Sequence, residues 1–213
     1  MDLAKGRTLK LHTSPLLGPC TASYFSSDIL SCVLKSISGL EVLHYDIACR
    51  TMYPGYSEYL SSFQSAIDVH KETLRELSLT ANTVPLKEIV WWYLTYLQWP
   101  FAAYPKLTKL NVTPKVLPSD VPPGSISPPL CLPPHIESLT IVPRYFREKV
   151  HRLLELLARD ISQFSRLKIV TAIVARRPKR PFNRSHIYAD RGLRRELTDE
   201  FSSLGVELRF EEV

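Results

Sequence analysis

One short hydrophobic pattern recurs along this chain, and it constrains the possible folds more than any other feature of the sequence. An aliphatic residue is followed by two variable residues, a second aliphatic residue, one variable residue and a further apolar residue. The copies begin at Leu40, Leu74, Leu107, Ile136 and Leu167, so their starts are 34, 33, 29 and 31 residues apart. This near-constant spacing indicates a repeat architecture with one structural unit per copy.

Each copy of the pattern is typical of a short β-strand. Side chains at the fourth and sixth positions point to one side of a strand, whereas the third, fifth and seventh point to the other. The fourth and sixth positions are apolar in every copy, which predicts one buried face and one open face. Residues 8–11 form a further strand candidate before the first copy, and residues 206–210 form a terminal strand.

The segments between these strands have helical periodicity. Residues 144–164 carry an apolar stripe at steps of three and four, with Glu148/Arg152 and Glu155/Arg159 paired on the polar side. Four shorter segments predict the other helices. The first is the stripe Ile29, Val33 and Ile37, which Gly39 stops, and the second is the stripe Tyr59, Leu60, Phe63, Ala66 and Ile67. The third is the aromatic window 89–103, and the last is the stripe Leu193, Leu197, Phe201 and Leu204.

Alternating strands and helices predict an α/β fold with parallel strands and right-handed crossovers. With all helices on one side, we expect a curved solenoid with strands on the concave face and helices on the convex face. We expect one domain over residues 1–213, with units starting near residues 9, 40, 74, 107, 136 and 167. Residues 114–134 contain eight prolines and exclude a helix, so we predict a closing loop there, with an interdomain linker as the alternative.

Residues 74–82, LRELSLTAN, fit the LxxLxLxxN signature in full, and the chain thereby resembles leucine-rich repeat proteins. The phrases KETLRELSL, YPKLTKLNV and LPPHIESLTI resemble the C-terminal repeat region of fungal F-box proteins. This resemblance implies the substrate-recognition part of an F-box-type ubiquitin ligase adaptor. An F-box precedes the repeats in that family, whereas a strand candidate begins here at residue 8. We therefore expect a free-standing repeat module or a part of a longer protein.

The sequence contains no motif of catalysis or metal binding. The six histidines have no HxH, HExxH or HxxxH spacing, and the four cysteines form no CxxC pair. Glycine-rich phosphate loops and the GxSxG motif are also missing, in keeping with only 7 Gly against 17 Pro. We therefore expect a non-enzymatic protein that needs no cofactor and no metal.

Positive charge is concentrated in residues 144–184, which hold twelve basic and three acidic residues. Within them, Arg176, Arg177, Lys179 and Arg180 resemble a nuclear import signal, with a solvated loop or a nucleic-acid site as alternatives. The N-terminus has no apolar run of signal-peptide length. The aromatic window 89–103 is broken by Pro100 and is shorter than the about 20 residues of a membrane-spanning helix. We expect a cytoplasmic or nuclear protein that does not cross a membrane.

The open face is the predicted functional site, because its mixed polar surface suits a protein partner better than a small cofactor. Its side chains are Val42, His44, Glu76, Ser78, Lys109, Asn111, Ser138, Thr140, Ile169 and Thr171. We therefore predict a protein-binding scaffold. A regulatory or nucleic-acid-binding protein that acts through the basic segment 144–184 is the alternative.

The first repeat has no predicted cap. Only eight residues precede Leu9, and the segment that follows residues 8–11 is rich in proline. Terminal repeats need a polar outer surface, since an uncapped unit leaves apolar side chains in water. We therefore predict an apolar edge near Leu3, Leu9 and Leu11, through which the chain self-associates.

Overall fold

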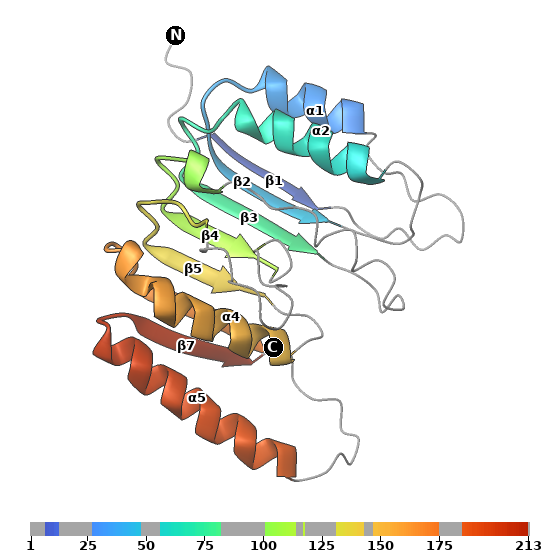
Figure 1. The fold of residues 1–213 in the computed structure, drawn as a ribbon. Coiled ribbons are helices and arrows are strands. Elements are labelled where there is room, and N and C mark those ends of the chain that lie inside the picture. Colours follow the sequence, from blue (N-terminus) through green and yellow to red (C-terminus); the bar gives the residue numbers. More distant parts are fainter. Residues whose placement is uncertain are drawn as a thin grey trace, which may run out of the picture.

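The computed structural model describes residues 7–12, 27–47, 56–81, 101–113, 117, 131–142, 147–174 and 185–212. Its strands form one seven-stranded parallel sheet in which they follow one another in chain order (Figure 1). They are β1 (Arg7–His12), β2 (Leu40–Ile47), β3 (Glu76–Ala81), β4 (Lys109–Val112), β5 (Ser138–Ile141), β6 (Ile169–Val174) and β7 (Glu207–Glu212). The predicted α/β class is confirmed, and every copy of the hydrophobic pattern contributes a strand.

The helices lie on one side of this sheet (Figure 1). They are α1 (Ser27–Ser36), α2 (Tyr56–Asp68), α4 (Arg147–Asp160) and α5 (Ser185–Ser203), with the short 3₁₀ helices η2 (Phe101–Ala103) and η4 (Ile161–Gln163). Gly39, which follows α1, has a φ of +69°, as expected for the residue that stops a helix. The opposite side of the sheet is the open face.

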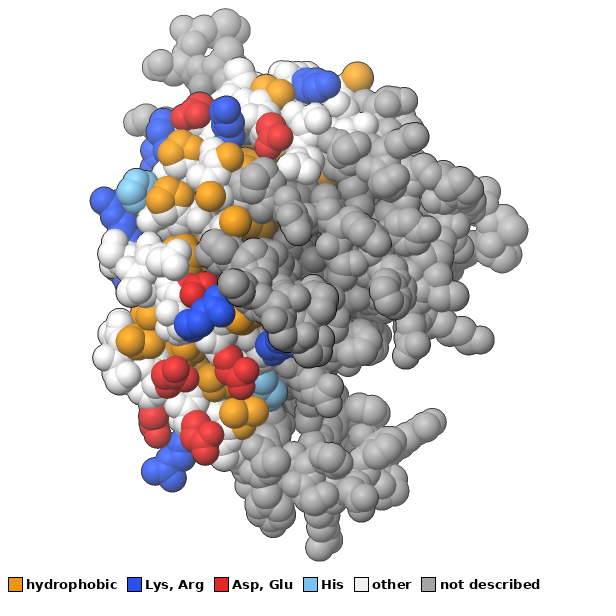
Figure 2. All heavy atoms as spheres, viewed as in Figure 1, with side chains coloured by type: hydrophobic (Ala, Val, Ile, Leu, Met, Phe, Trp, Pro, Cys, Tyr) orange, Lys and Arg blue, Asp and Glu red, His pale blue; other side chains and the backbone are white. Residues whose placement is uncertain are grey.

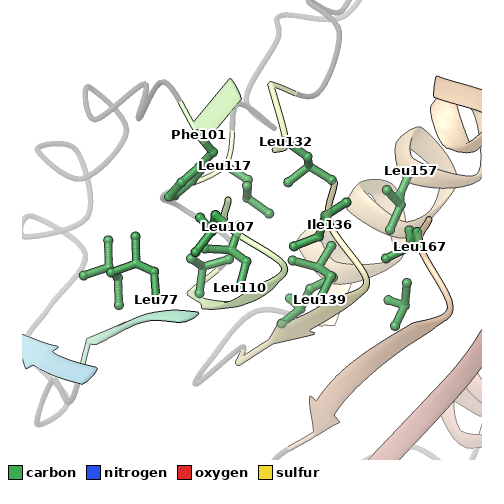
Figure 3. Close-up of a cluster of buried hydrophobic side chains, with 14 of the residues drawn as sticks. Leu77, Phe101, Leu107, Leu110, Leu117, Leu132, Ile136, Leu139, Leu157 and Leu167 are labelled. Carbon is green, nitrogen blue, oxygen red and sulfur yellow. The ribbon is translucent and has the colours of Figure 1, made fainter. Parts of the chain in front are cut away.

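The core combines helix side chains with strand side chains that stack in register between neighbouring units. One such column is formed by Leu43, Leu77, Leu110, Leu139, Val170 and Leu208, all of which are buried. Figure 3 shows Leu77, Leu110 and Leu139 of this column beside Leu107, Ile136 and Leu167 from the starts of their units. The alternation of the sequence pattern is therefore the alternation between the core and the open face.

The buried face of α1 is displaced by one residue from the apolar stripe that the sequence predicts. Ile29 and Val33 are 51% and 38% exposed, whereas Leu34 is fully buried and Ile37 packs partly against the core. The described residues contain no helix before α1, so α1 has a helical neighbour, α2, on one flank only. The stripe that includes Ile29 and Val33 consequently faces solvent.

Two smaller expectations for the C-terminal half are also wrong. Leu204 is 45% exposed, because it follows the end of α5 in a turn that closes at Gly205, whose φ is +76°. Arg159 pairs with its neighbour Asp160, at 2.8 Å, instead of with Glu155. Asp160 is buried at the end of α4, where a carboxylate needs a charged partner.

Several sequence predictions fall on residues outside the described ones. These are most of the proline-rich segment 114–134, the aromatic window up to residue 100, the basic run 176–180 and Leu3. In β1, Leu9 packs partly against the core, while the side chain of Leu11 is not among those that the structure describes. None of the described helices has the length and hydrophobicity needed to cross a bilayer.

Candidate protein-binding face

The predicted binding residues lie in two neighbouring rows across the open face. The first row is Val42, Glu76, Lys109, Ser138 and Ile169, one residue from each strand from β2 to β6. The second row, two residues further along the same strands, is His44, Ser78, Asn111, Thr140 and Thr171. The strand register thus brings all of the predicted residues together on one surface.

Glu76, on β3, contacts side chains of both neighbouring strands, β2 and β4. Its carboxylate accepts a hydrogen bond from His44 Nε2 on β2 at 2.7 Å, and its other oxygen lies 3.6 Å from Lys109 Nζ on β4. All three side chains remain partly exposed, so the network is accessible from solvent. A partner that docks here meets both a carboxylate and an ammonium group within one cluster.

The centre of the second row is uncharged. Ser78, Asn111, Thr140 and Thr171 place three hydroxyls and one amide on four consecutive strands, and Ser78 and Thr171 are buried between their neighbours. Asn111 Oδ1 is shielded from solvent and has no hydrogen-bond partner among the described residues. Such an atom is costly to leave unpaired. Because Asn111 as a whole is only half-buried, a rotation of its side chain toward a bound partner would let a donor of that partner satisfy it.

The terminal strand β7 extends both rows with two residues that were not among the predicted binding residues. Glu207 is in register with Ile169, and Arg209 is in register with Thr171. Arg209 donates two hydrogen bonds to Glu207, at 2.7 and 2.8 Å. These bonds lower the pKa of the Glu207 carboxyl and raise that of the guanidinium. Applying the alternation of the repeat pattern to residues 206–210 would have found both.

The described residues of the open face offer hydrogen bonds and ion pairs. The described residues contain no group of three or more His, Cys, Asp or Glu that could hold a metal ion. Cys32 and Cys131 are exposed, and neither belongs to the two rows. The surface can therefore recognise a polar partner through side chains from β2 to β7.

These features define the class of the protein, an α/β fold with a seven-stranded parallel sheet whose helices lie on one side. No protein-family model, curated protein or solved structure matches the chain with significance.

Proposed function

We propose that the chain is an irregular leucine-rich repeat solenoid that works as a non-enzymatic protein-binding scaffold. Its open face binds a protein partner, in the manner implied for the substrate-recognition region of an F-box-type ubiquitin ligase adaptor. The arrangement of one strand per repeat, in chain order, supports the solenoid, since each unit then contacts only its neighbours.

The unpaired amide oxygen of Asn111 is the observation that carries this proposal. A scaffold that needed only stability would fill the centre of the open face with groups that satisfy one another. Instead, Asn111 lies among hydroxyl side chains with one polar atom shielded and unpaired. The Glu76 network on one flank and the Glu207–Arg209 pair on the other add charges of both signs. This pattern fits the polar rim and the hydrogen-bonding centre of a protein interface.

A pull-down with a matched control tests the proposal. The open-face variant replaces Glu76, Lys109 and Asn111 by alanine. The control replaces Glu155, Arg195 and Gln163, an acid, a base and an amide that are all exposed on the helix side. We expect both variants to melt close to the parent chain, and only the open-face variant to capture less partner. Equal capture by both variants would move the binding site to the loops or to the helices.

The alternative function through the basic segment 144–184 gains no support from the part of it that the structure describes. Over residues 147–174, Arg159 pairs with Asp160 and Lys168 lies 3.4 Å from Glu137. Arg152, on α4, and Arg166, before β6, come from different elements. Filter binding to oligonucleotides at two salt concentrations tests this alternative, because genuine phosphate contacts weaken steeply with salt.

A further inference from the structure

The turns that precede β4, β5 and β6 share one geometry. Each is closed by a backbone hydrogen bond between residues three apart: Leu107 N to Tyr104 O at 3.2 Å, Ile136 N to Pro133 O at 3.2 Å, and Leu167 N to Phe164 O at 2.9 Å. The residue just before the bonded N–H is basic or imidazole-bearing in all three turns. These residues are Lys106, His135 and Arg166, all exposed, and we call them the basic column.

The basic column follows the spacing of the sheet. Glu137 N bonds to Thr108 O at 2.8 Å, and Lys168 N bonds to Glu137 O at 3.0 Å, so the chains are already at strand spacing just after the turns. Parallel strands lie about 5 Å apart, which places the three side chains along a line of roughly 10 Å. The column lies at the edge of the sheet where the strands begin, on the left in Figure 1.

The basic column differs from the basic residues next to it in its ion pairs with the described carboxylates. Arg75 lies 3.7 Å from Glu41, Lys109 lies 3.6 Å from Glu76, and Lys168 lies 3.4 Å from Glu137. By contrast, no carboxylate of the described residues forms an ion pair with Lys106 or Arg166. The cations in or directly before the strands are therefore paired with carboxylates, whereas Lys106 and Arg166 of the turns form no ion pair with a described carboxylate.

From this placement we propose that the basic column binds an acidic peptide segment of a protein partner, laid across the three turns. Alternate side chains of an extended peptide are roughly 7 Å apart, a distance that flexible Lys and Arg side chains can match. Arg166 can hold a carboxylate by two parallel hydrogen bonds. This proposal concerns a surface beside the open face and stands independently of the function proposed above.

The aromatic residues of the same turns favour an acidic peptide over a nucleic acid. Single-stranded nucleic acids bind through aromatic platforms on which their bases stack. In these turns the aromatic rings of Tyr104 and Phe164 are buried in the core and cannot serve as platforms. The exposed groups that remain in these turns are the side chains of the basic column, and the carboxylates of an acidic peptide can pair with them.

The helix side differs from the basic column in the signs of its exposed charges. Acidic side chains gather over α4 and α5 (Figure 2), where Glu155, Glu196, Asp199 and Glu200 are exposed. The same helices also expose the basic residues Arg152, Arg159 and Arg195, so this region carries charges of both signs. In the turns before β4 and β6, by contrast, Lys106 and Arg166 are exposed cations that form no ion pair with a carboxylate of the described residues.

Fluorescence anisotropy with a short labelled peptide in which Glu and Ser alternate tests the proposal. The column variant carries Lys106→Gln and Arg166→Gln. The control carries Lys35→Gln and Arg195→Gln, which remove the same charge from exposed helical positions. At low salt we expect the column variant to bind roughly tenfold more weakly than the parent, and the control to stay within about twofold. Because all four side chains are exposed, the thermal melts of both variants should match that of the parent.

Two outcomes would overturn the proposal. Equal weakening in both variants would show that the peptide responds to net charge alone. Tighter binding of a single-stranded oligonucleotide than of the peptide, lost in the same column variant, would assign the column to nucleic acid. Neither outcome bears on the open face, because the column variant leaves Glu76, Lys109 and Asn111 unchanged.

Discussion

The hydroxyl of Tyr104 donates a hydrogen bond to Asp68 Oδ1 at 2.5 Å, across a separation of 36 positions in the chain. His70 makes the equivalent link one unit earlier, since its Nε2 donates to the carbonyl oxygen of Leu34 at 2.8 Å, also 36 positions away. In both cases a residue of the turn before a strand holds the end of the preceding unit's helix. These links fasten neighbouring repeats on the helix side, as the strand register does in the sheet.

Removing one link should weaken the contact between two units. Tyr104→Phe keeps the buried ring and deletes the hydroxyl, so we expect a loss of about 1 kcal/mol in the free energy of unfolding. Urea denaturation measures this loss. In the background Asp68→Ala, from which the acceptor is missing, the same change should cost much less. An equal cost in both backgrounds would show that the hydroxyl acts through another contact.

The motif leucines should contribute far more than exposed apolar residues. Leu77 is fully buried in the column that runs from β2 to β7, and Leu77→Ala should destabilise the chain by roughly 2–5 kcal/mol. Val69 is 59% exposed, so Val69→Ala should stay within about 0.5 kcal/mol of the parent. Matching urea midpoints for the two variants would contradict the repeat register.

Replacing Gly39 by alanine should lower the stability of the chain, whereas replacing Gly192 by alanine should raise it. Gly39 has a φ of +69°, and a methyl group there meets no atom within 4 Å, so only backbone strain opposes the substitution. Gly39→Ala should therefore destabilise the chain by about 1 kcal/mol. Gly192, inside α5, also has open space around it, and Gly192→Ala should stabilise the chain by about 0.5–1 kcal/mol. Thermal melts measure both changes. A shift of the melting temperature in the same direction for both variants would contradict the prediction.

The pair on the terminal strand should be visible in a pH titration. Because Arg209 holds the pKa of Glu207 below its ordinary value, mainly through the side-chain hydrogen bonds, the ionised pair favours the folded state. That contribution is present above the pKa of the unfolded glutamate and is lost as the pH falls through the folded value. Both groups are exposed, so the effect on stability should be small. NMR titration should show the pKa of Glu207 returning to its ordinary value in Arg209→Gln, and an unchanged pKa would refute the pairing.

Self-association remains a prediction for the N-terminal end. Leu9 is only partly buried, and the same end of the molecule exposes Ile29 and Val33 on α1. Light scattering should show a molecular mass that rises with concentration. Ile29→Ser combined with Val33→Ser should reduce this rise, whereas the exposed control Val69→Ser should not. A concentration-independent monomer would mean that these apolar residues are not a contact surface.

The strands and both rows of the open face could be predicted because they depend on alternation within a few residues. Once Leu43, Leu77 and Leu110 are aligned by the pattern, the register of their neighbours follows from strand geometry. The position of the α1 stripe could not be predicted, because periodicity gives the spacing of a stripe and leaves open which flank has a neighbour. Leu34 is buried and Val33 is not, a difference decided by tertiary packing.

The links between units escaped prediction for a different reason. Tyr104 and His70 are separated from their partners by a whole repeat, and nothing local in the sequence marks Asp68 or the Leu34 carbonyl as an acceptor. The basic column was missed because its members lie in three separate units. Only stacking of the turns before β4, β5 and β6 brings them into line.

Photo-crosslinking from single positions tests most directly whether the open face binds the partner. A benzophenone amino acid replaces Ser138, at the centre of the first row, or Glu155, an exposed residue of α4 on the helix side. If the open face is the binding site, the partner recovered with the parent chain should crosslink from position 138 and not from position 155. Crosslinking from position 155 alone would place the partner on the helices and contradict the proposed function.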